Sequence, residues 1–322
     1  MAQGIEVQRA PRLRSTFINQ ELVLLLVLVV LVVGLSQFSK EFLTANNLFA
    51  ITRFFVEAGL IALPMTLIII TGGIDLSVGS MFGLSSVMLG FAWQFWGLPL
   101  PLGILVCLLV GVLAGLVNGV LIAKVKVPPL IVTLATLAIY RGLAFGISQA
   151  RSVRGYPAWF EFWGQGYVGP IPTQFLILVV FAAVSAIFLQ RTFWGRYIYA
   201  LGSNETGARF SGIPVDRIKI LLYTFSGLMC GLAGFIFTSR VTTTRADAGT
   251  GLELDVITAV VLGGASIYGG EGSIYGTALG LLAVYLLRNG LTLANIKGDA
   301  TVTIVGAMLI VAVYLKRLIT RK

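Results

Sequence analysis

The sequence predicts an all-helical integral membrane protein with about ten membrane-spanning helices. Of its 322 residues, 57% are hydrophobic and only 11% are charged, whereas an ordinary soluble domain carries about 25% charged residues. The apolar runs are long and continuous. The strands of a membrane β-barrel instead alternate apolar and polar residues over about ten positions. The runs therefore predict helices, and most of the chain is expected to lie in the bilayer.

The individual spans follow from the apolar runs, because a helix needs roughly 20 apolar residues to cross the hydrocarbon. The segment 254–268 is short and has glycine-rich neighbours, which leaves its depth in the membrane open. The first run follows three arginines, as in a signal peptide, but lacks a small-x-small cleavage site, so it is predicted to be an uncleaved helix. The predicted spans are 21–38, 55–71, 79–96, 101–123, 130–148, 173–190, 219–239, 254–268, 273–293 and 300–316.

The distribution of basic residues predicts that both termini are cytoplasmic. With ten spans, fourteen Lys and Arg residues fall in the inner segments and seven in the outer segments, as the positive-inside rule requires. This topology explains the net charge of +10. No basic run is interleaved with aromatic residues, so no nucleic-acid partner is expected. The predicted organisation is a cytoplasmic segment 1–20, one transmembrane domain 21–316 and a cytoplasmic tail 317–322.

Catalytic chemistry is not predicted for this chain. Histidine is absent, which excludes His-based zinc, haem and triad sites, and Cys107 and Cys230 lie inside apolar runs. No phosphate-binding loop of the type G-x-x-x-x-G-K-[ST] occurs. We therefore expect no metal site, no cofactor and no enzymatic activity in this chain.

Two glycine-rich segments predict a weak internal repeat. "TGGIDLSVGSMFGL" from Thr71 and "LGGASIYGGEGSIYGTALG" from Leu262 each place Gly-Gly, a few polar residues and Gly-Ser between apolar helices. Paired glycine-interrupted segments are typical of transporters built from two related halves. In the first segment, Asp75 and Ser77 can cap the restarting helix. Alternatively, Asp75 lines a polar pathway or contacts a cytosolic partner, because charged residues within or beside spans often have a function.

The longest inner loop, 190–220, is basic and contains a predicted short helix. Ser203 or Asn204 is the expected N-cap, and Gly212 and Pro214 end the helix. Three residues of this stretch are expected to form a small apolar knob that inserts into a groove on another protein. These residues are Ala208, Phe210 and Ile213.

Three motifs in order, "TGGIDLSVGS", "ALGSNETGARFSGIPVDRIK" and "GLELDVITAVVLGGASIYGGEGSIYGT", resemble the membrane permeases of bacterial ribose-type sugar ABC importers. The related permeases for galactoside, xylose, rhamnose and autoinducer 2 share the pattern, which covers about residues 20–316. The resemblance implies an ABC importer permease in the bacterial inner membrane, paired with a second copy or a paralogue. It also implies a periplasmic sugar-binding protein and a cytoplasmic ABC ATPase, which would bind the ATP and Mg.

The resemblance also places the contact with the ATPase in the cytoplasmic loop 191–218. Family members commonly read "N-x-x-A-A-x-x-S-G-I" there, and this chain has glycine at one of the two alanine positions. Another departure is Glu271, where a basic residue is common. The expected coupling residues are Asn204, Glu205, Gly207, Ala208, Arg209, Phe210, Ser211, Gly212 and Ile213.

A sugar pathway needs polar side chains that bind hydroxyl groups weakly. The candidates are Thr71, Asp75, Asn118, Thr133, Thr136 and Asn289. The alternative is an ion-coupled secondary transporter of a small polar solute, which normally has a carboxylate deep in a span. Glu57 and Asp255 are the available carboxylates, but both are near span ends. Residues 139–143 and the stretch "SQARSVRGYP" favour the rhamnose or autoinducer 2 branch.

Overall fold

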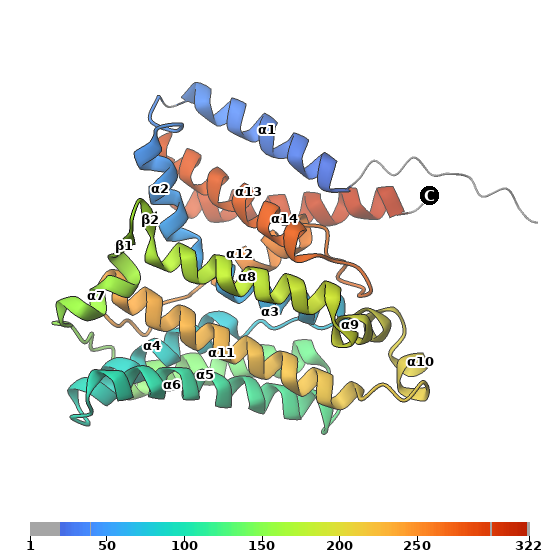
Figure 1. The fold of residues 1–322 in the computed structure, drawn as a ribbon, viewed down its shortest axis with the longest axis horizontal. Coiled ribbons are helices and arrows are strands. Elements are labelled where there is room, and N and C mark those ends of the chain that lie inside the picture. The colour runs from blue at the N-terminus through green and yellow to red at the C-terminus, as the bar shows by residue number, and fades with distance from the viewer. Residues whose placement is uncertain (1–19, 39, 297, 321–322) are drawn as a thin grey trace, which may run out of the picture.

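The computed structural model describes residues 20–38, 40–296 and 298–320 and consists almost entirely of helices (Figure 1). The predicted end segments 1–20 and 317–322 lie outside the described residues, apart from Gln20 and the last turn of the final helix. The helices are α1 Gln20–Phe38, α2 Ala45–Phe54, α3 Val56–Ile70, α4 Val78–Gln94, α5 Leu100–Ala123, α6 Pro129–Ser148, α7 Ala158–Gln165, α8 Thr173–Arg191, α9 Phe193–Ser203, α10 Glu205–Phe210, α11 Val215–Val241, α12 Leu252–Leu262, α13 Ile274–Leu293 and α14 Gly298–Thr320. A short antiparallel hairpin joins β1 Tyr167–Val168 to β2 Ile171–Pro172.

The prediction of an all-helical membrane protein is confirmed. Within the described residues, five helices are long and apolar enough to cross a membrane: α5, α6, α8, α11 and α13. Helices α2 and α3 are bent by 49° at their junction, and they add a sixth span if the bent pair is counted as one crossing. Each predicted span coincides with a helix. Judged by helix length and hydropathy, however, the described residues support five or six crossings and not ten.

The predicted span 254–268 is wrong in length, because α12 has 11 residues and ends at Leu262. Such a helix is about 16 Å long, compared with a hydrocarbon core of about 30 Å. Two glycines end it. A Cβ atom at Gly263 would overlap the carbonyl oxygen of Gly276 at the start of α13, and Gly264 has a φ of +98°. The close approach of α13 and the left-handed backbone therefore stop the helix.

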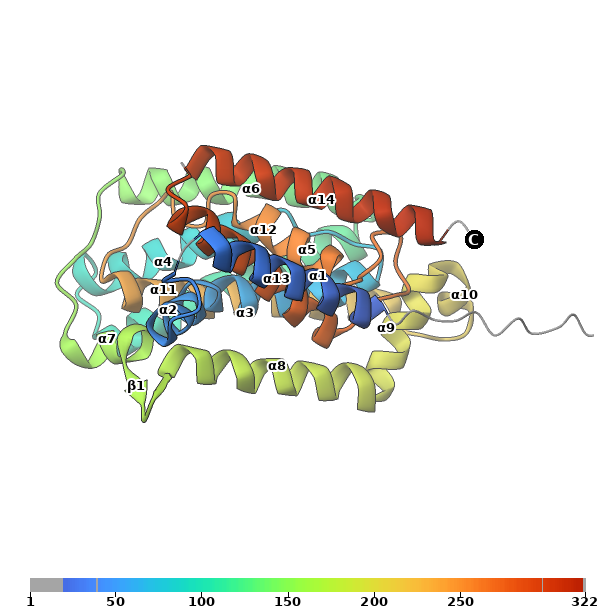
Figure 2. The same ribbon diagram turned by 90° about the horizontal axis from the view of Figure 1, so that it is seen from above.

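The long helices lie side by side, and the two ends of the bundle differ (Figures 1 and 2). Helices α9 and α10 lie at one end. The start of α1 and the end of α14 lie at the same end. The connections 149–172 and 242–251 lie at the opposite end. The bundle therefore presents one end with both ends of the described chain and a short helix, and another end made of loops.

Helix α3 forms the centre of the bundle. All of its residues from Val56 to Ile70 are buried, and it contacts α8, α11, α12 and α13. A helix that is apolar on every side is expected in the interior. Its neighbour α11 packs very closely against α5, because Gly111 and Gly115 meet Gly227 backbone to backbone. Small residues at such crossings are typical of membrane helices.

Candidate functional site: the α10 region and the buried polar cluster

Helix α10 is a single, well-capped short helix, as predicted. The side chain of Asn204, the N-cap, accepts a hydrogen bond from the backbone N–H of Gly207 at 2.8 Å. At the other end, the N–H of Ile213 donates to the carbonyl oxygen of Ala208 at 3.1 Å, and Gly212 has a φ of +79°. Asn204, and not Ser203, is therefore the cap, and the glycine supplies the left-handed residue that ends the helix.

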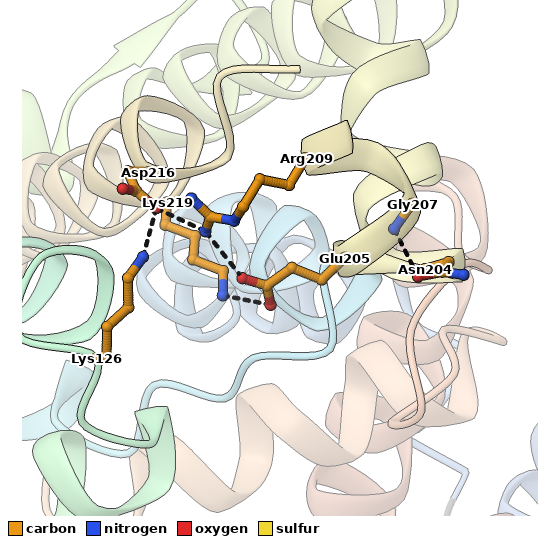
Figure 3. A network of polar contacts seen from close by, with 7 residues as sticks. All are labelled: Lys126, Asn204, Glu205, Gly207, Arg209, Asp216 and Lys219. Carbon is orange, nitrogen blue, oxygen red and sulfur yellow. Dashed lines mark hydrogen bonds and ion pairs between the residues drawn. The ribbon is translucent and has the colours of Figure 1, made fainter. Parts of the chain in front are cut away.

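A network of ion pairs holds α10 against its neighbours (Figure 3). Glu205 accepts hydrogen bonds from Lys219 Nζ at 2.7 Å and from Arg209 Nη2 at 3.4 Å. Asp216 accepts from Arg209 Nη2 at 2.8 Å and from Lys126 Nζ at 2.7 Å. The network thus links α10 to α11 and to the connection between α5 and α6. Single exposed ion pairs contribute only about 0–1 kcal/mol, but a connected set fixes the orientation of the helix.

The network remains charged at neutral pH. Partial burial acts to raise the pKa of Glu205, but hydrogen bonds and charge from Lys219 and Arg209 outweigh this effect. The pKa of the carboxyl group therefore lies below its ordinary value. Because a lowered pKa keeps the carboxylate ionised above its ordinary titration range, the network weakens only under acid conditions.

The predicted apolar knob is wrong in its composition. Ala208 is 5% exposed and belongs to the hydrophobic core, and Ile213 is partly buried. Phe210 is 89% exposed. The reason is packing: α10 contacts both α9 and α11, so one side of this short helix is covered. Phe210 is therefore the apolar side chain of this set that is available to another protein.

Helix α9 joins α10 to both glycine-rich segments. The N–H of Gly270 donates to the carbonyl oxygen of Ile70 at 2.9 Å, which brings the two segments together. Tyr199 of α9 donates its hydroxyl to the carbonyl oxygen of Gly272 at 2.7 Å. A Cβ atom at Gly202 would overlap the carbonyl oxygen of Ile70. Both segments interrupt helices as predicted, and the relation between two halves of the chain stays a prediction.

Asp75 lies in a fully buried polar cluster. Its Oδ1 accepts from the N–H and the hydroxyl of Ser77 at 3.0 and 2.6 Å, and its Oδ2 accepts from the Ser226 hydroxyl at 3.0 Å. Asn118 Nδ2 donates to the Ser77 hydroxyl at 2.8 Å, and the Tyr140 hydroxyl donates to the carbonyl oxygen of Ala114 at 2.9 Å and lies 3.3 Å from Asn118 Oδ1. The cluster connects the start of α4 to α5, α6 and α11. Of the two residues that the sequence offered as caps, Ser77 occupies the N-cap position but makes no capping hydrogen bond with its side chain, and Asp75 accepts from the N–H of Ser77 itself.

The other pathway candidates separate into two groups. The hydroxyl of Thr133 donates mainly to the carbonyl oxygen of Pro129 in its own helix at 2.9 Å, and it also lies 3.3 Å from the carbonyl oxygen of Ile74, beside the cluster. Thr71 and Thr136 donate to carbonyl oxygens of their own helices. Asn289 lies in α13, where it exchanges two amide hydrogen bonds of 2.9 Å with Asn47. The structure therefore brings Asp75, Asn118 and Thr133 together and places Asn289 apart from them.

Two ion pairs, each between a buried carboxylate and a partly buried arginine, were not predicted. Arg240 Nε donates to Glu57 Oε1 at 2.7 Å, and Arg288 Nη2 donates to Asp255 Oδ1 at 2.6 Å. Both carboxylates are thus neutralised by arginines. The sequence did not reveal the first pair, because its members are 183 residues apart. Arg240 lies in the last turn of α11, which was the available signal for that residue, whereas Arg288 lies inside α13.

Comparison with known proteins identifies the family. A family model described as "Branched-chain amino acid transport system / permease component" matches residues 47–313. The autoinducer 2 import system permease protein LsrD of Escherichia coli K12 is 38% identical over 299 residues, which cover 91% of this chain and 90% of that protein. The chain belongs to this permease family. LsrD of Shigella flexneri matches with the same identity and coverage.

This membership confirms the resemblance to permeases of the ribose-type ABC importers, among which the sequence motifs placed the autoinducer 2 permeases. The chain is a multi-pass membrane permease component of a transport system. The comparisons give no support to the ion-coupled alternative. No solved structure matches the chain.

Proposed function

We propose that this chain is the permease through which an ABC importer moves autoinducer 2, or a closely related sugar-like molecule, into the cytoplasm. The proposed substrate rests on the 38% identity to autoinducer 2 import permeases over nearly the whole of both chains. The segments at 139–143 and 148–157 favour the same branch. The family model has a broader description that includes branched-chain amino acids, so the test includes leucine.

We further propose ten membrane crossings with both termini in the cytoplasm. The structure supports this topology because the start of α1, the end of α14 and the basic α10 region lie at one end of the bundle. Shorter helices such as α4, with 17 residues, would cross together with their connecting segments. The connections 149–172 and 242–251 then face the periplasm, towards a binding protein that delivers the substrate.

Thiol labelling tests this topology. Arg151 is exposed in the connection 149–172 and Ser211 is exposed at the C-cap of α10, two elements at opposite ends of the bundle, and the native Cys107 and Cys230 are buried. In right-side-out vesicles, an impermeant maleimide should label the Arg151→Cys variant and leave the Ser211→Cys variant unlabelled until the membrane is permeabilised. Labelling of Ser211→Cys from outside would overturn the proposed orientation.

The energy for transport is proposed to arrive by contact at α10. This chain contains no phosphate-binding loop, so ATP and Mg would bind to the partner ATPase. Movement of α10 would pass through α9 to the two glycine-rich segments, since Tyr199 and Gly202 contact both. A second permease subunit, either another copy or a paralogue, would complete the pathway. We propose that the inner half of the route passes Asn118 and Thr133, with Asp75 holding the cluster in place.

Reconstitution tests the function. Proteoliposomes that contain the permease, its cognate ATPase and its binding protein should accumulate labelled autoinducer 2 in an ATP-dependent manner, and should not accumulate leucine. The purified permease alone should neither bind nor hydrolyse ATP. Accumulation of leucine in place of autoinducer 2 would reassign the substrate, and ATP binding by the isolated chain would contradict the subunit assignment.

A further inference from the structure

A cavity of about 570 Å³ lies in the half of the bundle away from α10. Arg240, one of its lining residues, is in the last turn of α11. The 27 residues of α11 extend about 40 Å from the α10 side, so the cavity is near the outer end of the proposed topology. Its volume falls within the range of roughly 300–1,000 Å³ that is typical of small-molecule sites.

The charged side chains of the cavity balance one another. Its lining includes Glu57, Arg240, Asp255 and Arg288, which form the two ion pairs described above. Two positive and two negative charges leave the site formally neutral. A ligand with a net charge would therefore gain no overall electrostatic attraction while losing its hydration.

Two polar atoms of these pairs remain unused. Glu57 Oε2 and Arg288 Nε are buried and have no hydrogen-bond partner among the described residues. Glu57 as a whole is 4% exposed. Buried polar atoms without partners are uncommon, since each loses its hydrogen bonds to water. Glu57 and Arg288 both line the cavity, and their two unused atoms, one acceptor and one donor, are together the complement of a hydroxyl group.

The remaining lining suits a small ring. Aromatic side chains from three helices, Phe82, Phe237 and Tyr285, line the same cavity. Ligand sites usually combine such apolar walls with a few polar groups that fix the orientation. Asn289, which the sequence singled out as a pathway candidate, also lines the cavity.

We propose that this cavity is an outer binding site of the permease for a neutral, hydroxylated small molecule. A hydroxyl of the ligand donates to Glu57 Oε2, and a ligand oxygen accepts from Arg288 Nε. The proposal rests on the proposed function, because it names the place where the transported molecule first binds to the membrane subunit. An amino acid fits less well, since its ammonium and carboxylate groups would each have to displace a partner from an existing ion pair.

Two conservative variants remove the unused atoms. Arg288→Lys keeps a positive charge for Asp255 but deletes the Nε–H donor. Glu57→Gln keeps an oxygen for Arg240 and replaces the free acceptor by a donor. The matched control is Arg245→Lys, which makes the same change in the exposed pair with Asp247, outside the cavity lining.

A third variant tests the cavity without touching its charges. Gly306 lines the cavity, and a Cβ atom added there would meet no atom within 4 Å. Gly306→Phe therefore fills ligand space at little cost to folding. Gly146→Phe is the control, because a Cβ atom at Gly146 is equally unobstructed and lies outside the cavity lining.

Binding is measured by ligand-observed NMR on the complete permease in nanodiscs, with autoinducer 2 and with leucine as probes. The wild-type protein and both controls should bind autoinducer 2 and not leucine. Arg288→Lys and Glu57→Gln should each weaken binding about tenfold, as expected for loss of one buried hydrogen bond. Gly306→Phe should abolish binding. Thermal unfolding of each variant verifies that the protein is folded.

The outcomes distinguish failure of the proposed binding site from failure of the proposed transport function. If the reconstituted importer accumulates autoinducer 2 but the permease shows no binding, or binding that Gly306→Phe leaves unchanged, the site is overturned and the function stands. Binding of leucine in preference to autoinducer 2 also overturns the proposed ligand class. If the importer does not accumulate autoinducer 2 at all, the proposed function fails.

Discussion

Replacing Phe210 by glutamate is expected to abolish ATP-driven uptake while leaving the amount of folded permease unchanged. Phe210 is 89% exposed at the end of α10, so folding should change by no more than about 0.5 kcal/mol. If the side chain inserts into a groove of the ATPase, a buried unpaired carboxylate there costs several kcal/mol. Since 1.4 kcal/mol corresponds to a factor of ten, binding should weaken at least a hundredfold.

The measurement is co-purification with the ATPase, followed by uptake in proteoliposomes. Phe210→Ala should show a smaller loss, because it removes the apolar contact without adding a charge. Phe95→Glu is the matched control. Phe95 is 51% exposed at the C-terminus of α4, away from α10, and its replacement should leave the ATPase bound. Normal uptake by Phe210→Glu with the ATPase still attached would show that α10 is an ordinary connection.

The local features of α10 could be predicted because their signals are local. Asn204 caps the helix through the N–H of Gly207, three residues away, and Gly212 ends it. The burial of Ala208 could not be predicted in this way. It depends on packing against α9 and α11, and the spacing of apolar residues in a six-residue helix does not specify which side is covered.

The membrane class could be predicted from composition, but the lengths of the helices could not. An apolar run such as 254–268 has the same residue pattern whether it crosses the bilayer or lies buried among other helices. Its early end at Leu262 follows from the contact between Gly263 and Gly276, which only the folded chain reveals. The ion pair of Glu57 with Arg240 is likewise a product of the fold.

Asp75 shows the same limit. The sequence placed an acid between two helices and left open whether it caps a helix, lines a pathway or contacts a cytosolic partner. Its partner Ser226 is 151 residues away, so the hydrogen bond that joins α4 to α11 could not be read from the motif. With this bond, the carboxylate connects three donors that would otherwise be buried without partners.

Replacing Asp75 by leucine is therefore expected to remove most of the folded permease from the membrane. Leucine has a similar size but accepts no hydrogen bonds. The N–H and hydroxyl of Ser77 and the hydroxyl of Ser226 would all lose their acceptor in the interior. Each buried donor left without a partner costs about 1–3 kcal/mol, and the total stability of a protein is commonly only about 5–15 kcal/mol.

Asp75→Asn is the matched control, measured beside Asp75→Leu by fluorescence-detected gel filtration and by uptake. The amide keeps one acceptor oxygen for Ser77, and the Ser226 hydroxyl can rotate to accept from the amide nitrogen. We therefore expect normal abundance and uptake within about threefold of wild type, since both partners keep a hydrogen bond to residue 75 and only the charge of the acceptor is lost. Normal abundance of Asp75→Leu would contradict the structural role. Normal abundance of Asp75→Asn without uptake would show instead that transport needs the charge itself, because every hydrogen bond that holds α4 to α11 can still form.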